Sequence, residues 1–155
     1  MVRLTDLPDY ESRHLLGKQM PPIGPPVWTR IEKPLHEMRV ALITTAGLHF
    51  RGDDAFHFTD ASYRPIPGEA DAKDLVMSHS SANFDKSGFA EDVNLVYPID
   101  RLKELSSQGS IGSIADVHYS FMGAGLEPKD WEASANQVAG LLKKDQVDAV
   151  FLTPV

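Results

Sequence analysis

Polar side chains that can bind ligands or move protons follow the apolar runs of this sequence. They come in four groups, which are Thr44, Thr45 and His49; Ser78, His79 and Ser80; His118, Tyr119 and Ser120; and Thr153. If the four runs are parallel strands of one sheet, their carboxyl ends lie along one edge, where open α/β sheets bind ligands. The sequence therefore predicts a polar site at the strand ends.

Two kinds of catalytic site built from these side chains are disfavoured. The candidate metal ligands are His49, His57, His79 and His118 with Asp53, Asp54 or Asp85. Their spacings match no compact ligand motif, so we expect ordinary hydrogen-bonded histidines and no metal. A catalytic triad of Ser80, His79 and Asp85 would lack the Gly-x-Ser-x-Gly turn that exposes a serine nucleophile.

Two other features could bind an anion. Arg64, within SYRPIP, could hold a substrate carboxylate through two hydrogen bonds, or it could pair with a surface acid. The glycines from Gly123 to Gly125 precede a predicted helix, whose amino terminus could bind an anion, but they lack the full G-x-G-x-x-G pattern. The residues alone thus indicate a polar edge without an identified nucleophile.

The composition limits the classes of function. The chain has 155 residues, of which 42% are hydrophobic and 24% charged, as is typical of one globular domain. Its net charge of −7 disfavours nucleic acid or a membrane surface as the partner. No signal-peptide pattern opens the chain, so a cytoplasmic protein is expected. The absence of cysteine excludes disulfides and a cysteine nucleophile within these residues.

The elements that position the polar groups are mainly strands. The predicted strands are residues 38–47, 74–81 and 147–155, and residues 115–125 predict another strand or an extended segment that ends in glycines. The predicted helices are 9–20, 100–109 and 127–146. Asp100 is expected to cap the second helix, on which Leu102 and Leu105 share a face. Residues 48–71 predict a long irregular loop. The pattern favours an α/β fold with a parallel-leaning, Rossmann-like or flavodoxin-like open sheet that is incomplete at the carboxyl terminus.

The chain divides into two parts by composition. Residues 1–37 form a proline-rich amino-terminal arm, and residues 38–155 form the α/β domain. The arm either crosses the surface or a partner, or packs on its own domain through Val27 and Trp28.

Several segments together resemble the protein B selenoprotein family, which serves glycine, sarcosine, betaine and D-proline reductases. The resemblance covers residues 38–155 and rests on ALITTAGLHFRGD, SYRPIPG, MSHSSANFD, NLVYPIDRLKEL, GSIGSIADVHYSFMG and VDAVFLTPV. In that family the Thr-Pro-Val strand leads directly into a redox-active selenocysteine or cysteine. The resemblance implies that Asp148 to Val155 is the platform for this nucleophile. Selenocysteine is encoded by UGA, so a reading frame ended at that codon is one explanation for the sequence, and a cloned fragment or a natural truncation is another.

The resemblance also implies an activity and partners. The family reductively cleaves a C–N bond of an amino-acid-like substrate with a selenol or thiol nucleophile. No cofactor is expected in this chain; a pyruvoyl group is expected on a partner subunit, and a thioredoxin-like or dithiol reductant resets the enzyme. Supporting catalytic roles fall to His79, His118 and Tyr119, of which the tyrosine orients a histidine. Substrate binding and positioning fall to Thr44, Thr45, Gly47, His49, Arg64, Ser80 and Thr153.

Two other readings of the sequence remain open. One is a non-catalytic binding or assembly module of the same fold, since the chain contains no nucleophile of the family type. The other is a metal- or anion-dependent enzyme that uses the histidine-rich edge. For the reductase reading, the sequence does not distinguish glycine, sarcosine, betaine and proline as the substrate.

Overall fold

The computed structural model describes residues 3–17, 24–25, 29–81 and 84–155. The chain divides into two units, residues 1–32 and 33–155. The first unit holds a short 3-10 helix, η1 (Leu4–Asp6), and helix α1 (Asp9–Gly17), none of whose side chains is buried. Val27 and Trp28, which the sequence offers as packing residues, lie outside the described residues.

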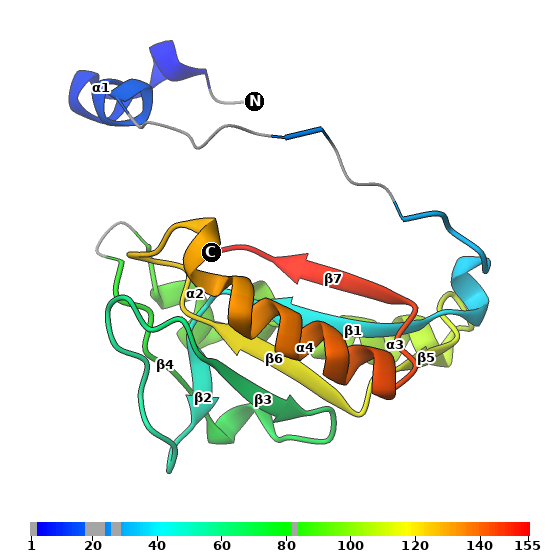
Figure 1. Ribbon diagram of the computed structural model, residues 1–155. Coiled ribbons are helices and arrows are strands. Elements are labelled where there is room, and N and C mark those ends of the chain that lie inside the picture. The colour runs from blue at the N-terminus through cyan, green and yellow to red at the C-terminus, as the bar shows by residue number, and fades with distance from the viewer. Residues whose placement is uncertain (1–2, 18–23, 26–28, 82–83) are drawn as a thin grey trace. The chain divides into compact units, whose positions relative to one another are not determined.

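The second unit is built on one mixed, mostly parallel sheet. Its strands are β1 (Arg39–Thr44), β3 (Tyr63–Pro67), β5 (Ser113–Ile114), β6 (Val117–Phe121) and β7 (Ala149–Thr153). The strand β1 pairs in parallel with β6 and β5 on one side and with β7 on the other, while β3 runs antiparallel to β6 (Figure 1). The predicted α/β class with a parallel-leaning open sheet is confirmed.

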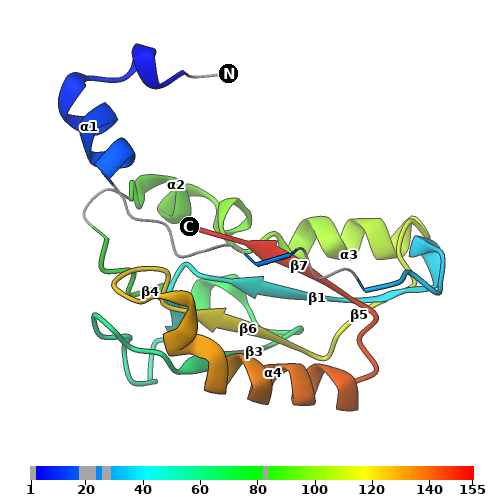
Figure 2. The same ribbon diagram turned by 45° about the horizontal axis from the view of Figure 1, so that its top comes forward.

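Helices cover the two faces of this sheet. The remaining elements are η2 (Leu35–Glu37), η3 (Ala72–Asp74), α2 (Ser87–Glu91), η4 (Val93–Leu95), α3 (Ile99–Ser107), η5 (Pro128–Trp131) and α4 (Glu132–Lys144). Helix α3 packs its Leu102 on one face and α4 packs Val138 on the other, so the continuous apolar run of β1 is buried from both sides (Figure 2). No helix within the described ranges has the length and apolar character needed to cross a bilayer.

The predicted second strand does not join this sheet. Strand β4 (Leu75–Met77) pairs antiparallel with β2 (Leu48–Phe50) in a separate two-stranded sheet. The expectation that four parallel strands share one edge is therefore wrong for this strand. A three-residue apolar run carries no signal for the direction in which it pairs.

The region predicted as an irregular loop contains strands β2 and β3. Strand β3 includes Pro65 and Pro67, which lack an N–H for the ladder, so it is tolerated because it lies at the edge beside β6. The prolines masked the strand in the sequence, since proline within a run usually argues against a strand.

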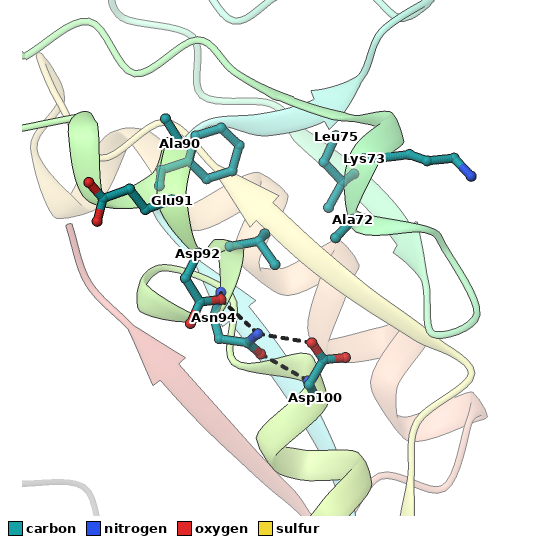
Figure 3. A pocket seen from close by; sticks show the side chains of 10 residues that line it. Ala72, Lys73, Leu75, Ala90, Glu91, Asp92, Asn94 and Asp100 are labelled. Atoms are coloured by element: carbon teal, nitrogen blue, oxygen red, sulfur yellow. Dashed lines mark hydrogen bonds between the residues drawn. The ribbon is translucent and has the colours of Figure 1, made fainter.

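Helix α3 starts one residue earlier than predicted, and Asp100 is not its cap. Pro98 occupies the N-cap position, and Asp100 lies in the first turn of the helix. The Asp100 carboxylate accepts from Asn94 Nδ2, and the Asp100 N–H donates to Asn94 Oδ1. Asn94 and Asp100 line a pocket of about 390 Å³, in which Asn94 Nδ2 donates to the carboxylates of Asp92 and Asp100 (Figure 3). Leu102 is buried, whereas Leu105 is exposed. Gly109, at φ +72°, ends the helix as predicted.

The last predicted strand is confirmed as β7, but its predicted burial is wrong. Val150, Phe151 and Leu152 are 38%, 50% and 65% exposed. Strand β1 covers one edge of β7, and within the described part of the chain no strand pairs with the other edge. An apolar sequence therefore forms an edge strand whose side chains lack neighbours on the outer side.

Candidate functional site

The carboxyl ends of β1, β6 and β7 lie side by side and form the candidate site. Beyond the ends of β1 and β6, Ala46 and Met122 form an isolated antiparallel bridge. The Gly47 N–H donates to the Phe121 carbonyl at 2.9 Å. We call this region the strand-end site and define it by Thr44, Thr45, Gly47, His79, Met122, Gly123, Thr153 and Val155. It is the edge that the sequence analysis predicted, formed by three strands instead of four.

Threonine hydroxyls fasten the end of β7 to the end of β1. The Thr153 carbonyl accepts from Thr45 N at 3.2 Å and from Thr44 Oγ1 at 3.4 Å. In return, Thr45 Oγ1 accepts the main-chain N–H of Val155 at 2.9 Å. The position of Val155 is thus set by a side chain on the neighbouring strand.

Thr153 also reaches the helical layer beneath the sheet. Its Oγ1 donates to the Val96 carbonyl at 3.0 Å and lies 3.3 Å from the Ile43 carbonyl. The predicted ligand-binding hydroxyls of Thr44, Thr45 and Thr153 are therefore used in holding main chain. This arrangement suits positioning of the strand end more than direct contact with a ligand.

Gly123 allows the main chains to approach closely at this site. A Cβ atom at position 123 would lie 2.8 Å from both the Thr45 and the Val155 carbonyl oxygens. The sequence pattern had offered Gly123 to Gly125 as an anion cradle at a helix start, but α4 begins at Glu132 after a 3-10 turn. The signal in the sequence is a glycine two residues beyond the end of β6, since glycine beside a strand often marks a close backbone approach.

Gly47 brings the end of β4 onto the same site. Gly47 has φ +65°, its carbonyl accepts from Ser78 N at 2.9 Å, and a Cβ there would be 3.1 Å from His79 N. His79 thereby reaches the strand-end site although its strand belongs to the other sheet. The predicted meeting of Thr44, Thr45, Gly47, His79 and Thr153 is found.

His79 is the titratable side chain at this site. It is 2% exposed, its ring lies edge-on to Phe84 at 5.1 Å, and Nδ1 accepts from Ser81 N at 3.3 Å. This pattern assigns the ring proton to Nε2, which is directed at the Val155 main chain but forms no hydrogen bond of standard geometry with the described residues. Burial lowers the pKa of His79, the charge of Lys86 acts in the same direction, and the Val155 main chain opposes both. His79 is therefore a neutral, buried N–H donor.

Two predicted residues adjoin the strand-end site. Ser80 Oγ contacts Met122 Sδ at 3.5 Å, which places it beside the β6 exit. His49 is buried, with Nδ1 donating to the Phe50 carbonyl at 2.7 Å and Nε2 accepting from Ser78 Oγ at 2.6 Å. Both ring nitrogens of His49 are thus satisfied within the fold.

His118 and Tyr119 lie in the interior and not at the strand ends. His118 is fully buried, its Nδ1 accepts from Leu42 N at 3.0 Å, and burial, helped by the charge of Lys103, lowers its pKa to about 4. Tyr119 packs on the α4 face against the ring of Tyr63 at 5.7 Å, and burial raises its pKa. Because successive residues of a strand point to opposite faces, the structure does not let Tyr119 orient His118.

Arg64 is engaged away from the strand-end site. Its guanidinium donates to Ser62 Oγ at 2.6 Å and to Asp60 at 3.3 Å, and it lies 4.4 Å from the centre of the Phe56 ring. Of the two roles that the sequence left open for Arg64, pairing with a nearby acid is the one observed. No group of three or more histidine or acidic side chains in the described ranges is placed to hold a metal.

The chain is similar in sequence to subunits of known reductase complexes. The chain matches the family model for the glycine/sarcosine/betaine reductase selenoprotein B over residues 22–155. It is 39% identical over 136 residues to the D-proline reductase subunit gamma of Acetoanaerobium sticklandii, covering 86% of this chain and 55% of that protein. It is 33% identical to the glycine reductase complex component B subunit gamma of Symbiobacterium thermophilum, covering 85% of this chain and 30% of that protein.

A third relative belongs to another complex of the same kind. The betaine reductase complex component B subunit beta of Peptoclostridium acidaminophilum is 26% identical, with 78% of this chain and 29% of that protein covered. The chain thus spans about half or less of the length of these relatives. No solved structure matches it. On the family match, which includes every residue of the strand-end site, the chain belongs to the glycine/sarcosine/betaine reductase selenoprotein B family.

Proposed function

We propose that this chain is part of the selenol- or thiol-dependent subunit of a reductase complex that cleaves a C–N bond of an amino-acid-like substrate. The observation that carries the proposal is the fixed position of Val155, which Thr45 holds by its hydroxyl and Gly123 flanks without a side chain. A catalytic residue directly after a strand needs such a rigid platform, because small displacements of a nucleophile cost large factors in rate.

The residues present fit an anionic nucleophile beside Val155. In the full-length subunit, the residue after Val155 is a selenocysteine or cysteine whose ionised form supplies the nucleophile for C–N cleavage. The buried Nε2–H of His79, which faces the Val155 main chain without a hydrogen bond of standard geometry, is a donor suited to that anion or to the substrate carboxylate. Because the site is buried, such a donor stabilises charge more strongly than it would in water.

His79 acts in its neutral form. Its lowered pKa keeps the imidazole uncharged near neutral pH, so it donates a hydrogen bond without adding a buried positive charge. The threonines contribute by holding the main chain, and Gly47 by admitting the backbone of His79. This chain therefore supplies position and one hydrogen-bond donor.

The favoured substrate is D-proline. Identity is 39% with the D-proline reductase subunit but 33% and 26% with the glycine and betaine reductase subunits, and the share of the relative covered is also larger. Cleavage of the ring C–N bond of D-proline takes up two electrons and two protons and gives a linear amino acid with a primary amine. A dithiol that becomes a disulfide supplies both electrons and protons.

The proposal includes partners and a compartment. A second subunit carries a pyruvoyl group that activates the substrate amine, and a thioredoxin-like or dithiol reductant resets the enzyme. Since this cycle needs thiols kept reduced, the proposal assigns the complex to the cytoplasm.

The second candidate is a non-catalytic binding or assembly module of the same fold. It is favoured by the absence of cysteine from the 155 residues and by the engagement of all three site threonines in main-chain bonds. Under this reading the strand-end site is only structural.

The test is to isolate the complex that contains this chain from its source organism and to supply a dithiol with D-proline, glycine, sarcosine or betaine. A primary-amine reagent detects ring opening of D-proline, the ammonia released reports on glycine, and the methylated amine released reports on sarcosine and betaine. We expect substrate-dependent formation of disulfide and amine in equal amounts, fastest with D-proline. Binding of substrates without any amine formation supports the module instead.

A further inference from the structure

An apolar groove runs between α4 and β7 on one face of the sheet. It has a volume of about 400 Å³ and is lined almost wholly by apolar side chains, among them Ile43, Trp131, Ala135, Ala139, Leu142 and Leu152. Leu152 is 65% exposed, and Ala135 and Ala139 are exposed on α4. A large apolar side chain on a strand beside such a groove usually marks a surface that another element covers.

The topology indicates which element fits. The chain passes from β6 through α4 to β7, crossing β1 toward the β7 edge, with α4 on the face that carries Leu152 and Ile43 (Figure 2). Crossovers between parallel strands are right-handed in nearly all proteins. A further crossover in the same direction therefore places its helix on the same face, next to α4, and its strand along the free edge of β7.

The surface has the chemistry that such an element needs. Small side chains one helical turn apart on α4, Ala135 and Ala139, permit close approach of a second helix. The outer edge of β7 presents main-chain groups that a parallel strand pairs with.

We propose that the groove and the outer edge of β7 bind a helix and a parallel strand from the part of the full-length family subunit that lies outside this chain. The relatives provide the length: this chain spans 55% of the D-proline reductase subunit gamma and 30% of the glycine reductase subunit gamma. The proposal concerns assembly of the subunit and is independent of the reaction it catalyses.

The test is to co-express the tagged 155-residue chain with the part of the Acetoanaerobium sticklandii subunit that lies outside the match. The chain carries Trp28→Phe, so that Trp131 is its only tryptophan. We expect a one-to-one complex in which the fluorescence of Trp131 shifts to shorter wavelength relative to the chain alone. We also expect slower hydrogen exchange along β7.

Two groove variants and one matched control complete the test. Leu152→Glu and Ala139→Glu should each lower recovery of the complex at least about tenfold, since a buried carboxylate is costly. Leu105→Glu, on the exposed side of α3, should leave it unchanged. Circular dichroism of each chain shows whether a variant has folded, and Ala139→Glu lies on an exposed helix position where folding is least affected.

Several results would overturn the proposal. One is that both polypeptides accumulate but do not copurify. Another is equal loss of the complex in Leu105→Glu and the groove variants. A third is that the chain alone forms a dimer that Leu152→Glu dissociates, which would make a second copy the occupant of the groove.

Discussion

The Thr45 hydroxyl accepts the main-chain N–H of Val155 at 2.9 Å, joining residues that are 110 positions apart in the sequence. Thr45 follows β1 and Val155 follows β7, so this bond fixes the exit of the edge strand to the centre of the sheet. The geometry of the strand-end site therefore depends on the Thr45 side chain, which holds the main chain of the neighbouring strand.

Replacing Thr45 by valine tests this bond. Valine keeps the shape of the side chain but leaves the Val155 N–H without an acceptor, so we expect a loss of about 1 kcal/mol in unfolding free energy. Amide exchange at Val155, measured by NMR, should accelerate several-fold. Thr45→Ser keeps an acceptor and should change exchange less. Equal exchange in the valine and serine variants would show that the hydroxyl does not hold the strand end.

Gly123→Ala tests the close approach at the same site. The new Cβ would lie 2.8 Å from two carbonyl oxygens of the main chain, which must move apart. We expect a loss of about 1–3 kcal/mol in unfolding free energy, measured by urea denaturation.

Gly140→Ala is the matched control for that variant. A Cβ at position 140 meets nothing within 4 Å, and alanine is the better helix former in α4, so a gain of up to about 1 kcal/mol is expected. Destabilisation of similar size in both variants would contradict the packing described for Gly123.

His118 should make stability depend on pH. Its pKa is about 4 in the folded chain and 6.5 in the unfolded chain, so protons bind the unfolded state more readily. Its contribution is complete above pH 6.5 and is lost as the pH falls from 6.5 to 4, by up to about 3 kcal/mol. His118→Asn keeps an acceptor for the Leu42 N–H but does not titrate, so its stability should fall less over this range. Parallel pH curves for the two proteins would contradict the burial of a neutral His118.

Arg39 should stabilise the opposite end of the sheet. It bonds to Asp145 at 2.6 Å, to Asp116 at 2.8 Å and to the Ile114 carbonyl at 2.6 Å. A lysine cannot reproduce these directions, so Arg39→Lys should cost about 1–3 kcal/mol in unfolding free energy. The control Arg101→Lys, at an exposed pair with Glu104, should cost about 0.5 kcal/mol or less. Similar losses of unfolding free energy in the two variants would show that the Arg39 hydrogen bonds stabilise the fold no more than an exposed ion pair does.

The sequence predicted the strands that have long apolar runs and the helix with a clear apolar stripe. Strand β1 and helix α4 were predictable because Val40 to Ile43 are continuously apolar and Val138 and Leu142 recur at helical spacing. Strand β3 was not, because its prolines argue against pairing, and only its place beside β6 makes them tolerable. Local pattern therefore identified elements but not their neighbours.

For the strand-end site, too, the sequence predicted local features but not contacts between distant residues. Thr44, Thr45 and Thr153 were found because residues after parallel strands gather at one edge. His118 was assigned to that edge because it is polar and close to a strand end, but a strand of five residues places it in the interior, bonded to Leu42. The packing role of Gly123 was not predicted, because it depends on Val155, which is distant in the sequence.

The most direct test of the proposed role of the strand-end site compares two histidine variants of the full-length subunit in its complex. His79→Gln should lower kcat for dithiol-dependent amine formation from D-proline at least about tenfold, because it displaces the buried Nε2–H donor. His36→Gln, which replaces an exposed histidine, should leave kcat within about twofold of the unmodified complex. A His79→Gln complex that keeps full kcat, or one that loses no more than His36→Gln, would contradict a catalytic site at the ends of β1, β6 and β7.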